Sequence, residues 1–472
     1  MQSAITYLCR AGRISPCVTI GVLPDNVLLD VFEFYREVIH LDIRFKWPWY
    51  TLVHVCRRWR YVVFGSPFRL NVCLRCTYKT RESEMLNIWP PLPITIHVRS
   101  PHKGYDVDDI IATLEHRDRI RRILIIHPTS SQFERLASMM QEPFPALTCL
   151  QLELQTGETT PALPNIFLGG STPRLQALFL NNIPFPGLSR LLLSTTDLSI
   201  LWLERIPDTG YISPEAMVTG LSGLTRLRYL TIRFESAASR PDRHPPPLTR
   251  VILPALKMLT FQGVSEYLGD LMARIDAPRL CSLYISFFNQ IIFDVQQLFH
   301  FIGRAGILTS SSRASVFVSH WHDHVEATFH EKDSPNYLGL KIYCRGADRQ
   351  VRSVARICKQ LSFLPSIVEE LYIDCYRKVR VDIEGAQWLQ LFRPFTAVRT
   401  LRMCRNLKPL IVRALRELTG ERATEVLPAL DSLYLEESQP SGSEQQAIEP
   451  FIAARQHSDH PVVVHRWGER WD

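Results

Sequence analysis

The sequence predicts an α/β protein in two parts: an N-terminal unit of three short helices and a long solenoid of repeated parallel strands. Apolar residues recur at helical spacing between residues 23 and 70, and a leucine motif then returns repeatedly as far as residue 435. The length of 472 residues agrees with this division, since a single hydrophobic core rarely grows beyond about 250–300 residues.

The amino-acid composition excludes several classes of protein. Hydrophobic residues make up 46% of the chain and charged residues 21%, which is typical of a globular protein and excludes a disordered, collagen-like or coiled-coil chain. The net charge of +7 is spread along the sequence without a long basic block, so we expect no nucleic-acid partner. Glycine is scarce, with 21 residues against 32 prolines, which leaves few places for a phosphate-binding loop.

The cysteines and the N-terminus predict an intracellular protein. The 11 cysteines are odd in number and follow no disulfide framework, so we expect reduced thiols. Residues 1–20 contain Arg10, Arg13 and Pro16 and no apolar run long enough for a signal peptide. The longest apolar run without charge, residues 280–293, is shorter than the roughly 20 residues needed to cross a bilayer. We therefore expect a cytoplasmic or nuclear protein with no membrane partner.

The segment 21–70 predicts three helices. The first begins around Pro24, a residue suited to a first helical turn, and its apolar stripe has i, i+3, i+4 and i+7 spacing: Leu28, Val31, Phe32 and Tyr35. A second helix is expected around Leu52, and a third from Cys56 to the glycine stop at Gly65. Helices this short bury little apolar surface by themselves, so the unit needs a partner to cover its stripes.

These residues resemble an F-box over about 45 positions, roughly a tenth of the chain. The motifs are LPDNVLLDVFEFY and LVHVCRRWRYVVFGSPF, with a Leu-Pro start, a Val-Cys-x-x-Trp-Arg third helix and a closing Ser-Pro. In that family the motif binds a Skp-type adaptor, which links it to a cullin scaffold and a ubiquitin-conjugating enzyme. The resemblance implies adaptor contacts at Leu23, Pro24, Leu28, Val31, Phe32, Val53, Val55, Cys56, Trp59 and Arg60. The link at residues 37–48 is longer than usual in the family, which leaves the docking geometry open.

The rest of the chain repeats itself. Well-matched copies are FPALTCLQL from Phe144, LPALKMLTF from Leu253 and LPALDSLYL from Leu427. They share the core L-x-x-L-x-L, and looser copies complete a series whose middle apolar residues are Ile123, Leu150, Leu178, Leu201, Leu230, Leu259, Leu283, Leu371, Leu401 and Leu433.

This series resembles degenerate leucine-rich repeats, as they occur in fungal-type F-box substrate receptors of cullin-RING ubiquitin ligases. Each L-x-L pair points two apolar side chains to one side of a short strand, so the units must stack into a solenoid with parallel strands on the concave face. The 88 residues between Leu283 and Leu371 have room for two more copies, near Phe317 and Ile342. The family's asparagine is matched clearly only by Asn406, so we expect irregular repeats without an asparagine ladder.

The residue between the paired leucines points to the concave face. These positions form a row rich in aromatic residues: Gln151, Phe179, Trp202, Thr231, Thr260, Tyr284, Tyr372, Arg402 and Tyr434. Aromatic residues suit strands in general, but exposed ones on a concave sheet are good anchors for a protein partner. The candidate substrate-binding residues are therefore Phe179, Trp202, Tyr284, Tyr372, Arg402 and Tyr434.

The patterns also predict boundaries. The expected parts are an N-terminal segment at 1–20, the F-box-like helices at 21–70, the repeat array at 71–435, and a C-terminal loop and tail at 436–472. Proline-rich residues 236–247 are expected to form an exposed loop, residues 436–449 a polar linker, and residues 461–464 a last strand.

No set of residues predicts catalysis or a metal site. His320, His322 and His324 would share one face of a strand, but their spacing lacks one residue of the metallo-β-lactamase signature H-x-H-x-D-H, so we expect surface polar residues. A lone C-x-x-C at Cys73 and Cys76 is expected to be a pair of buried thiols. The sequence has no nucleotide-binding glycine loop and no G-x-S-x-G elbow, so we expect no cofactor and no enzyme activity.

The expected function is that of a substrate-recognition adaptor of a Skp-cullin-F-box ubiquitin ligase, which holds a protein substrate on its repeats for ubiquitin-dependent degradation. The alternative is a leucine-rich-repeat interaction scaffold whose helices only cap the array. A third hypothesis, a metal hydrolase, predicts stoichiometric zinc that is lost on His322→Ala.

Overall fold

The computed structural model describes residues 20–39, 48–77, 86, 88–99, 107–155, 160–237, 250–288, 296–308, 313–319, 323–332, 334–375, 383–418, 420–436 and 442–467. The chain divides into two units, which are described separately: Met1–Val98 with Gly104–Ile123, and Arg99–Lys103 with Leu124–Asp472. The first strands therefore belong with the N-terminal helices, whereas the sequence placed a boundary at residue 70.

The first unit begins with helices where the sequence predicts them: η1 (Ile20–Val22), α2 (Asp25–Ile39), α3 (Pro48–Val53) and α4 (Arg57–Gly65). The thiol sulfur of Cys56 caps α4 by accepting the backbone N–H of Trp59 at 3.4 Å. The Arg58 guanidinium donates to Asp25, 2.7 Å away, and to the carbonyl of Leu23. These bonds hold the N-terminal ends of α2 and α4 together.

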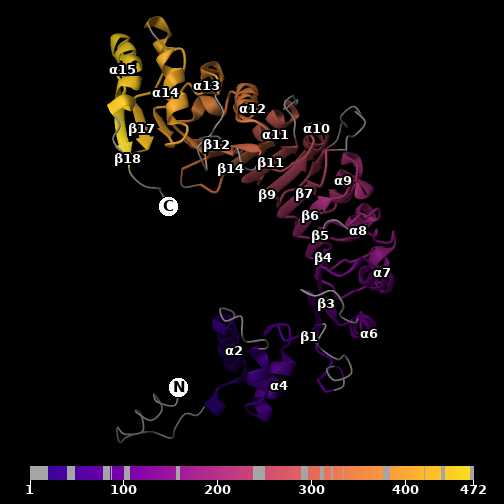
Figure 1. Cartoon of the computed structure of the whole chain (residues 1–472). Coiled ribbons are helices and arrows are strands. Elements are labelled where there is room, and N and C mark those ends of the chain that lie inside the picture. Colours follow the sequence, from indigo (N-terminus) through magenta and orange to yellow (C-terminus); the bar gives the residue numbers. More distant parts are fainter. Residues whose placement is uncertain are drawn as a thin grey trace, which may run out of the picture. The chain divides into compact units, whose positions relative to one another are not determined.

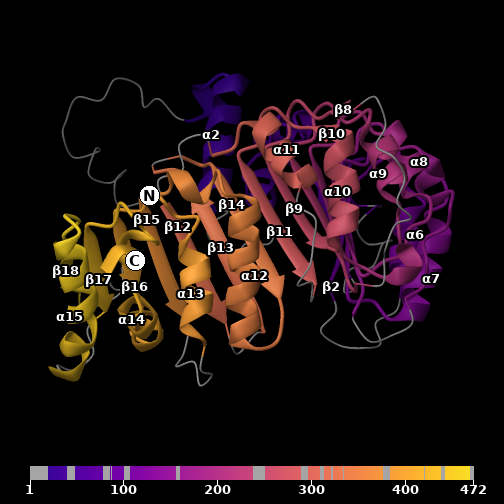
Figure 2. The ribbon, with the colours of Figure 1, turned by 90° about the horizontal axis from the view of Figure 1, so that it is seen from above.

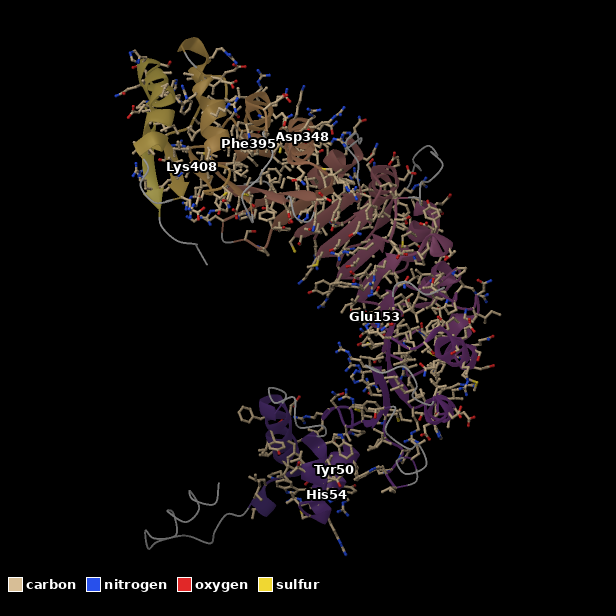
Figure 3. The ribbon with its side chains drawn as sticks, viewed as in Figure 1. Tyr50, His54, Glu153, Asp348, Phe395 and Lys408 are labelled. Atoms are coloured by element: carbon tan, nitrogen blue, oxygen red, sulfur yellow. The ribbon has the colours of Figure 1, made fainter. Side chains whose placement is uncertain are left out.

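Short strands and one more helix follow: β1 (Leu74–Cys76), β2 (Ile94–Arg99), α6 (Asp108–Leu114) and β3 (Ile120–Ile126), which crosses the division between the units. β1 pairs with β2 in parallel, Leu74 opposite Ile94. The Trp89 ring lies 5.4 to 6.4 Å, centroid to centroid, from rings on or beside α3 and α4: Trp49, Tyr50, His54 and Phe64. Figure 3 labels Tyr50 and His54 among them. The helices are thus packed on the segment that leads into β2.

The second unit alternates strands and helices. Its sheet strands, in spatial order, are β4 (Cys149–Glu153), β5 (Ala177–Asn181), β6 (Ile200–Ile206), β7 (Tyr229–Phe234), β9 (Met258–Gly263), β11 (Ser282–Phe288), β14 (Tyr337–Tyr343), β13 (His324–His330), β12 (Arg313–Ser319), β15 (Glu370–Cys375), β16 (Thr400–Met403), β17 (Ser432–Glu436) and β18 (Val463–Trp467). Its α-helices are α7 (Ser130–Met139), α8 (Leu188–Ser194), α9 (Pro214–Leu221), α10 (Ser265–Arg274), α11 (Gln296–Ala305), α12 (Ala347–Gln360), α13 (Gly385–Phe392), α14 (Lys408–Arg416) and α15 (Gly442–His457).

Shorter elements fill the connections: η2 (Phe167–Gly170), η3 (Asp208–Gly210), η4 (Pro365–Ile367), η5 (Gly420–Thr424), and the separate parallel pair β8 (Val251–Ile252) and β10 (Ile275–Asp276). Within this unit the strands line the inner, concave side and the helices the outer side (Figure 1). The view in Figure 2 shows the strands side by side, with α10, α12 and α13 packed over them.

The strand register confirms the repeat. From β4 to β11 the predicted middle leucines lie directly opposite one another in successive parallel strands: Leu150, Leu178, Leu201, Leu230, Leu259 and Leu283. The same holds from β15 to β17 for Leu371, Leu401 and Leu433. All of these leucines are fully buried. The second unit is therefore a leucine-rich-repeat-like solenoid with a long, mostly parallel sheet.

The array is interrupted where the sequence shows its long interval. Phe317 and Ile342 lie on strands, as predicted, but these strands do not follow each other in the order of the chain. β14 pairs with β11, and β12 pairs with β15, both in parallel, while β13 runs antiparallel between them. The interval therefore holds the two predicted strands and a third, β13, which reverses the direction of the chain within the sheet.

The segment 436–472 contains α15 and β18, so the expected loop and tail is wrong for much of it. α15 is anchored by Ile448 and Phe451, which are buried, and β18 extends the sheet in parallel to β17. The predicted last strand is confirmed, although it begins at Val463. The polar run that precedes Ile448 resembles a linker in sequence because few apolar residues mark the helix. Residues 238–247 of the expected proline-rich loop lie outside the described residues.

No helix in the described parts of the chain combines the length and the apolar character that a bilayer crossing requires.

Candidate interaction surfaces

The core of the helical unit contains several residues predicted as adaptor contacts. Leu28, Phe32 and Val53 are buried, and the Phe32 ring lies 4.7 Å from the ring of Trp59, which is half-buried. Side chains inside this core hold α2, α3 and α4 together. The adaptor contacts predicted at Leu28, Phe32 and Val53 stay predictions, and in the structure these residues serve as core. Of the other predicted contacts, Leu23 is half-buried and five are exposed: Pro24, Val31, Val55, Cys56 and Arg60.

α2 carries a second apolar stripe that faces outward. Val31 is 41% exposed and Phe34 69% exposed, and half-buried Val27 precedes them at i, i+4, i+7 spacing. We call Val27, Val31 and Phe34 the α2 outer stripe. Our sequence interpretation missed Phe34, although the spacing from Val27 was visible in the sequence.

The remaining sides of α2 are occupied. Arg69, which follows α4, forms ion pairs with Asp30 and, at 3.4 Å, with Glu33 on one side of the helix. Leu28 and Phe32 fill the inner side. The α2 outer stripe thus lies between an ion-paired side and a packed side.

On the concave face of the second unit, predicted anchors on β5 and β6 lie together. Phe179 and Trp202 are directly opposite in the register, with ring centroids 6.4 Å apart. Trp202 is 36% exposed, and its indole N–H donates to Glu204 at 2.7 Å. The hydrogen bond therefore orients the indole while the residue stays partly exposed. Thr231 and Thr260, in the same row, are buried, because a short side chain reaches less far from the sheet than the rings beside it.

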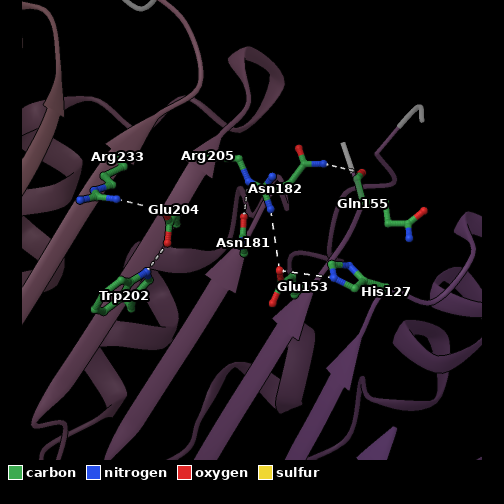
Figure 4. Close-up of polar contacts among 9 residues, drawn as sticks. All are labelled: His127, Glu153, Gln155, Asn181, Asn182, Trp202, Glu204, Arg205 and Arg233. Atoms are coloured by element: carbon green, nitrogen blue, oxygen red, sulfur yellow. Dashed lines mark hydrogen bonds and ion pairs between the residues drawn. The ribbon is translucent and has the colours of Figure 1, made fainter. Parts of the chain in front are cut away.

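Charged side chains lie beside Trp202 and toward the ends of the neighbouring strands (Figure 4). Glu204 also accepts from Arg233 at 3.1 Å, and Glu153 lies 3.8 Å from Arg205 and 3.7 Å from His127. Arg205 in turn donates to the side-chain oxygen of Asn181 at 2.7 Å. Figure 3 places Glu153 on the inner side of the sheet. The aromatic pair therefore has a polar rim whose charges are already paired, an arrangement typical of protein-binding surfaces.

Left-handed residues close the ends of two strands beside this rim. His127 and Asn182 both have a φ of 57°. Each donates its backbone N–H to a neighbouring repeat, His127 to the carbonyl of Glu153 and Asn182 to that of Glu204. The buried side chain of Asn182 also donates to the carbonyl of Gln155 at 2.8 Å. Asn182 thus links repeats as a ladder asparagine would, one position earlier than the pattern that identified Asn406.

Tyr284, the next predicted anchor, is half-buried in a cluster on β11, β13 and β14. It lies opposite Gly339, where an added Cβ would be 2.6 Å from the Tyr284 ring and 2.8 Å from the Tyr337 hydroxyl. Tyr337 donates to Glu326 at 3.4 Å. Burial, with the Glu326 charge second, raises the pKa of Tyr284 to about 12, and burial also raises the pKa of Glu326. This cluster is a packed part of the concave face rather than an open anchor.

At the C-terminal end the predicted anchors form a continuous row. Tyr372, Arg402 and Tyr434 lie opposite one another on β15, β16 and β17, and His465 on β18 extends the row. The Arg402 guanidinium lies 4.9 Å from the centre of the Tyr434 ring, and the Tyr434 and His465 rings stack at 4.6 Å. His465 has no signal in the sequence because β18 lacks the leucine motif.

The two sets of residues weighed for metal chemistry have different outcomes. His320 and His322 lie outside the described residues, and His324 is buried on β13. No group of three metal-ligating side chains occurs within the described ranges. Cys76 is buried, as expected, whereas Cys73 is only half-buried.

Comparisons with known proteins identify no family for the chain. No family model matches the chain, and no curated protein matches it. Among solved structures, the chain is similar to the leucine-rich repeat-containing protein LegL7 from Legionella pneumophila, with 13% identity, coverage of 73% of this chain and 89% of that chain, and a TM-score of 0.29. A likeness this weak carries no weight for function, and the solenoid rests on the strand register described above.

Proposed function

We propose that the protein is a substrate-recognition adaptor of a Skp-cullin-F-box ubiquitin ligase. The observation that carries the proposal is the α2 outer stripe, an exposed apolar face on the first helix of a unit whose sequence resembles an F-box. Exposed apolar residues at i, i+4, i+7 spacing are typical of a helix that docks on another protein. The partner at this face is a Skp-type adaptor, which connects the chain to a cullin.

In this role the protein supplies proximity and no chemistry of its own. A substrate bound to the repeats is held near the charged conjugating enzyme, which raises the effective concentration of its lysines. The substrate surface is the concave face, with Phe179 and Trp202 as one anchor and the row from Tyr372 to His465 as another. Both anchors combine rings with neighbouring charges, which suits a protein client.

Co-purification with a Skp-type adaptor tests the proposal. We expect wild-type protein to retain the adaptor, and Val31→Asp with Phe34→Asp to lose it, because two charges on the outer stripe cannot be buried in an interface. Leu193→Asp is a matched control, since Leu193 is an exposed leucine on α8 in the other unit. Leu23→Ala with Pro24→Ala tests the start of the motif. The proposal would be contradicted if every variant retained the adaptor. It would also be contradicted if the wild-type protein failed to retain it.

The second candidate function is an interaction scaffold that has no link to ubiquitination. The packing of Trp49 and Phe64 around Trp89 favours it, because this packing lets the helices cover the start of the strands. This function predicts that the Val31 and Phe34 double variant retains every partner of the wild type. Proximity labelling with the intact chain and with that variant separates the two: only the adaptor function predicts loss of ligase subunits while repeat-bound clients remain.

A further inference from the structure

Two buried cysteines meet between neighbouring repeats. Cys375 is the last residue of β15, and Cys404 directly follows β16. Ile373 lies opposite Met403 in the register, so the two cysteines leave adjacent parallel strands close together. Their sulfur atoms are 3.6 Å apart, and both side chains are buried. A disulfide needs about 2.05 Å between sulfur atoms, so the pair is about one side-chain adjustment from bonding distance.

The surroundings distinguish the two sulfurs. The sulfurs of Cys375 and Cys404 are within hydrogen-bond distance of each other, and the backbone N–H groups of Asn406 and Leu407, just before α14, also point at the Cys404 sulfur. These contacts lower the pKa of Cys404 despite its burial. The same sulfur contact, together with burial, raises the pKa of Cys375. Asp374 opposes a thiolate on Cys404, but burial raises the pKa of Asp374 as well. The N–H groups beside its sulfur make Cys404 the better candidate for the nucleophile of the pair, and Cys375 lies at the distance of a resolving thiol.

We propose that Cys375 and Cys404 form an oxidation site that converts reversibly to an intramolecular disulfide. The oxidant is a small peroxide. The Cys404 sulfur attacks one peroxide oxygen, the O–O bond breaks, and a sulfenic acid and one water result once the released hydroxide takes up the proton that Cys404 lost. The Cys375 sulfur then attacks the Cys404 sulfur, the S–O bond breaks, and hydroxide leaves as a second water with the Cys375 proton. Two thiols lose two electrons in total, and one peroxide becomes two waters.

The disulfide would join the two neighbouring repeats that carry Tyr372 and Arg402, the first two members of the C-terminal row on the concave face. Tyr372 and Arg402, which belong to that row, precede the cysteines on the same two strands. The loop closed by the bond contains α13. Oxidation therefore fixes the relative position of β15 and β16, whatever partner binds there, and the proposal stands independently of the proposed ligase role.

Thiol mass spectrometry on the full-length wild-type protein tests this. The reduced protein is exposed to hydrogen peroxide, quenched with acid, alkylated under denaturing conditions and digested. We expect a cross-linked peptide pair that contains Cys375 and Cys404 and that disappears after dithiothreitol. Cys358 is the matched control thiol: it is fully buried in α12, and burial raises its pKa to about 12, so it should remain alkylatable.

Cysteine variants test the roles of Cys404 as nucleophile and Cys375 as resolving thiol without requiring the disulfide to form. Cys375→Ser should leave a sulfenic acid on Cys404 that dimedone traps, and Cys404→Ser should abolish oxidation at Cys375. The proposal is overturned if the wild type loses the Cys358 thiol as fast as Cys404, or if Cys404 proceeds to sulfinic acid with no bond to Cys375. The wild-type measurement decides the matter even if a variant fails to fold.

Discussion

At the scale of the residue, the end of the solenoid depends on one buried arginine. Arg455 on α15 is fully buried, and its guanidinium donates to the carbonyls of Leu430 at 2.7 Å, Pro428 at 3.2 Å and Ala423 at 3.4 Å. These carbonyls precede β17. A single side chain therefore satisfies backbone acceptors that would otherwise be buried without donors.

Arg455→Met should destabilise the array. The methionine fills part of the space but leaves the three carbonyls without a donor, so we expect a loss of about 2–4 kcal/mol in the free energy of unfolding. Urea denaturation followed by circular dichroism measures it. Arg349→Met, at an exposed position on the outer helix α12, is the control and should change little. A loss at Arg455 no larger than the control's would show that the carbonyls find other donors.

Glu326 should make stability depend on pH. Burial raises its pKa above the ordinary value of 4.5, against the opposing effects of Lys341 and the Tyr337 hydrogen bond. An acid whose pKa rises on folding binds its proton more tightly in the folded state, so stability falls as pH rises from 4.5 through the raised pKa. Relative to wild type, Glu326→Gln should gain stability across that window. Urea midpoints measured from pH 4.5 to 8 test this, and a constant difference between the two proteins would contradict it.

Gly339 is required by the two rings above it. A Cβ at this position would lie 2.6 Å from the Tyr284 ring, too close for any real contact. Gly339→Ala should therefore lower the free energy of unfolding by about 1–3 kcal/mol, although alanine is otherwise the better residue in a strand. Gly223→Ala is the control, because an added Cβ there meets nothing within 4 Å. Equal stability of the two variants would mean that the tyrosines move aside at no cost.

At the scale of the element, local patterns in the sequence predict the strands better than their order. The leucine pattern identifies β4 to β11 and β15 to β17 with their register, because burial forces L-x-L to face the core. It also locates Phe317 and Ile342 on strands. It cannot show that β13 reverses the chain between them, since the partner of a strand depends on distant residues. α15 has little signal in the sequence because its buried face has few apolar residues, and part of what holds it in place is the set of carbonyls that Arg455 binds.

The candidate surfaces show the same limit. The row from Gln151 to Tyr434 follows from alternation, but which members are accessible does not. Thr260 is buried, Tyr284 is packed into a cluster, and Trp202 remains open. On α2, the F-box resemblance marks Phe32 and Val31 alike, yet only Val31 is exposed. Exposure depends on neighbouring elements and has no local signal.

At the scale of the whole molecule, α15 and β18 should stabilise the strands that precede them, because each solenoid unit depends on its neighbours. Truncation after residue 436 removes α15 and β18, leaving β17 as a bare edge strand and the carbonyls that Arg455 serves without donors. We expect a lower Tm and aggregation on heating, measured by circular dichroism and light scattering. Removal of residues 468–472 alone should leave both unchanged. Full stability of the longer truncation would show that the array ends at β17.

The reversed strand order from β11 to β15 also constrains how the chain can fold. Elsewhere each repeat can dock on the one just made, so order can spread along the chain one repeat at a time. β12 follows β11 in the chain but does not pair with it. The strand that pairs with β11 is β14, which comes later in the sequence. Growth from the N-terminal side must therefore pause until the three strands close as a group, a slow step because it joins residues far apart in sequence. The array should thus divide kinetically into an early block ending at β11 and a later block starting at β15.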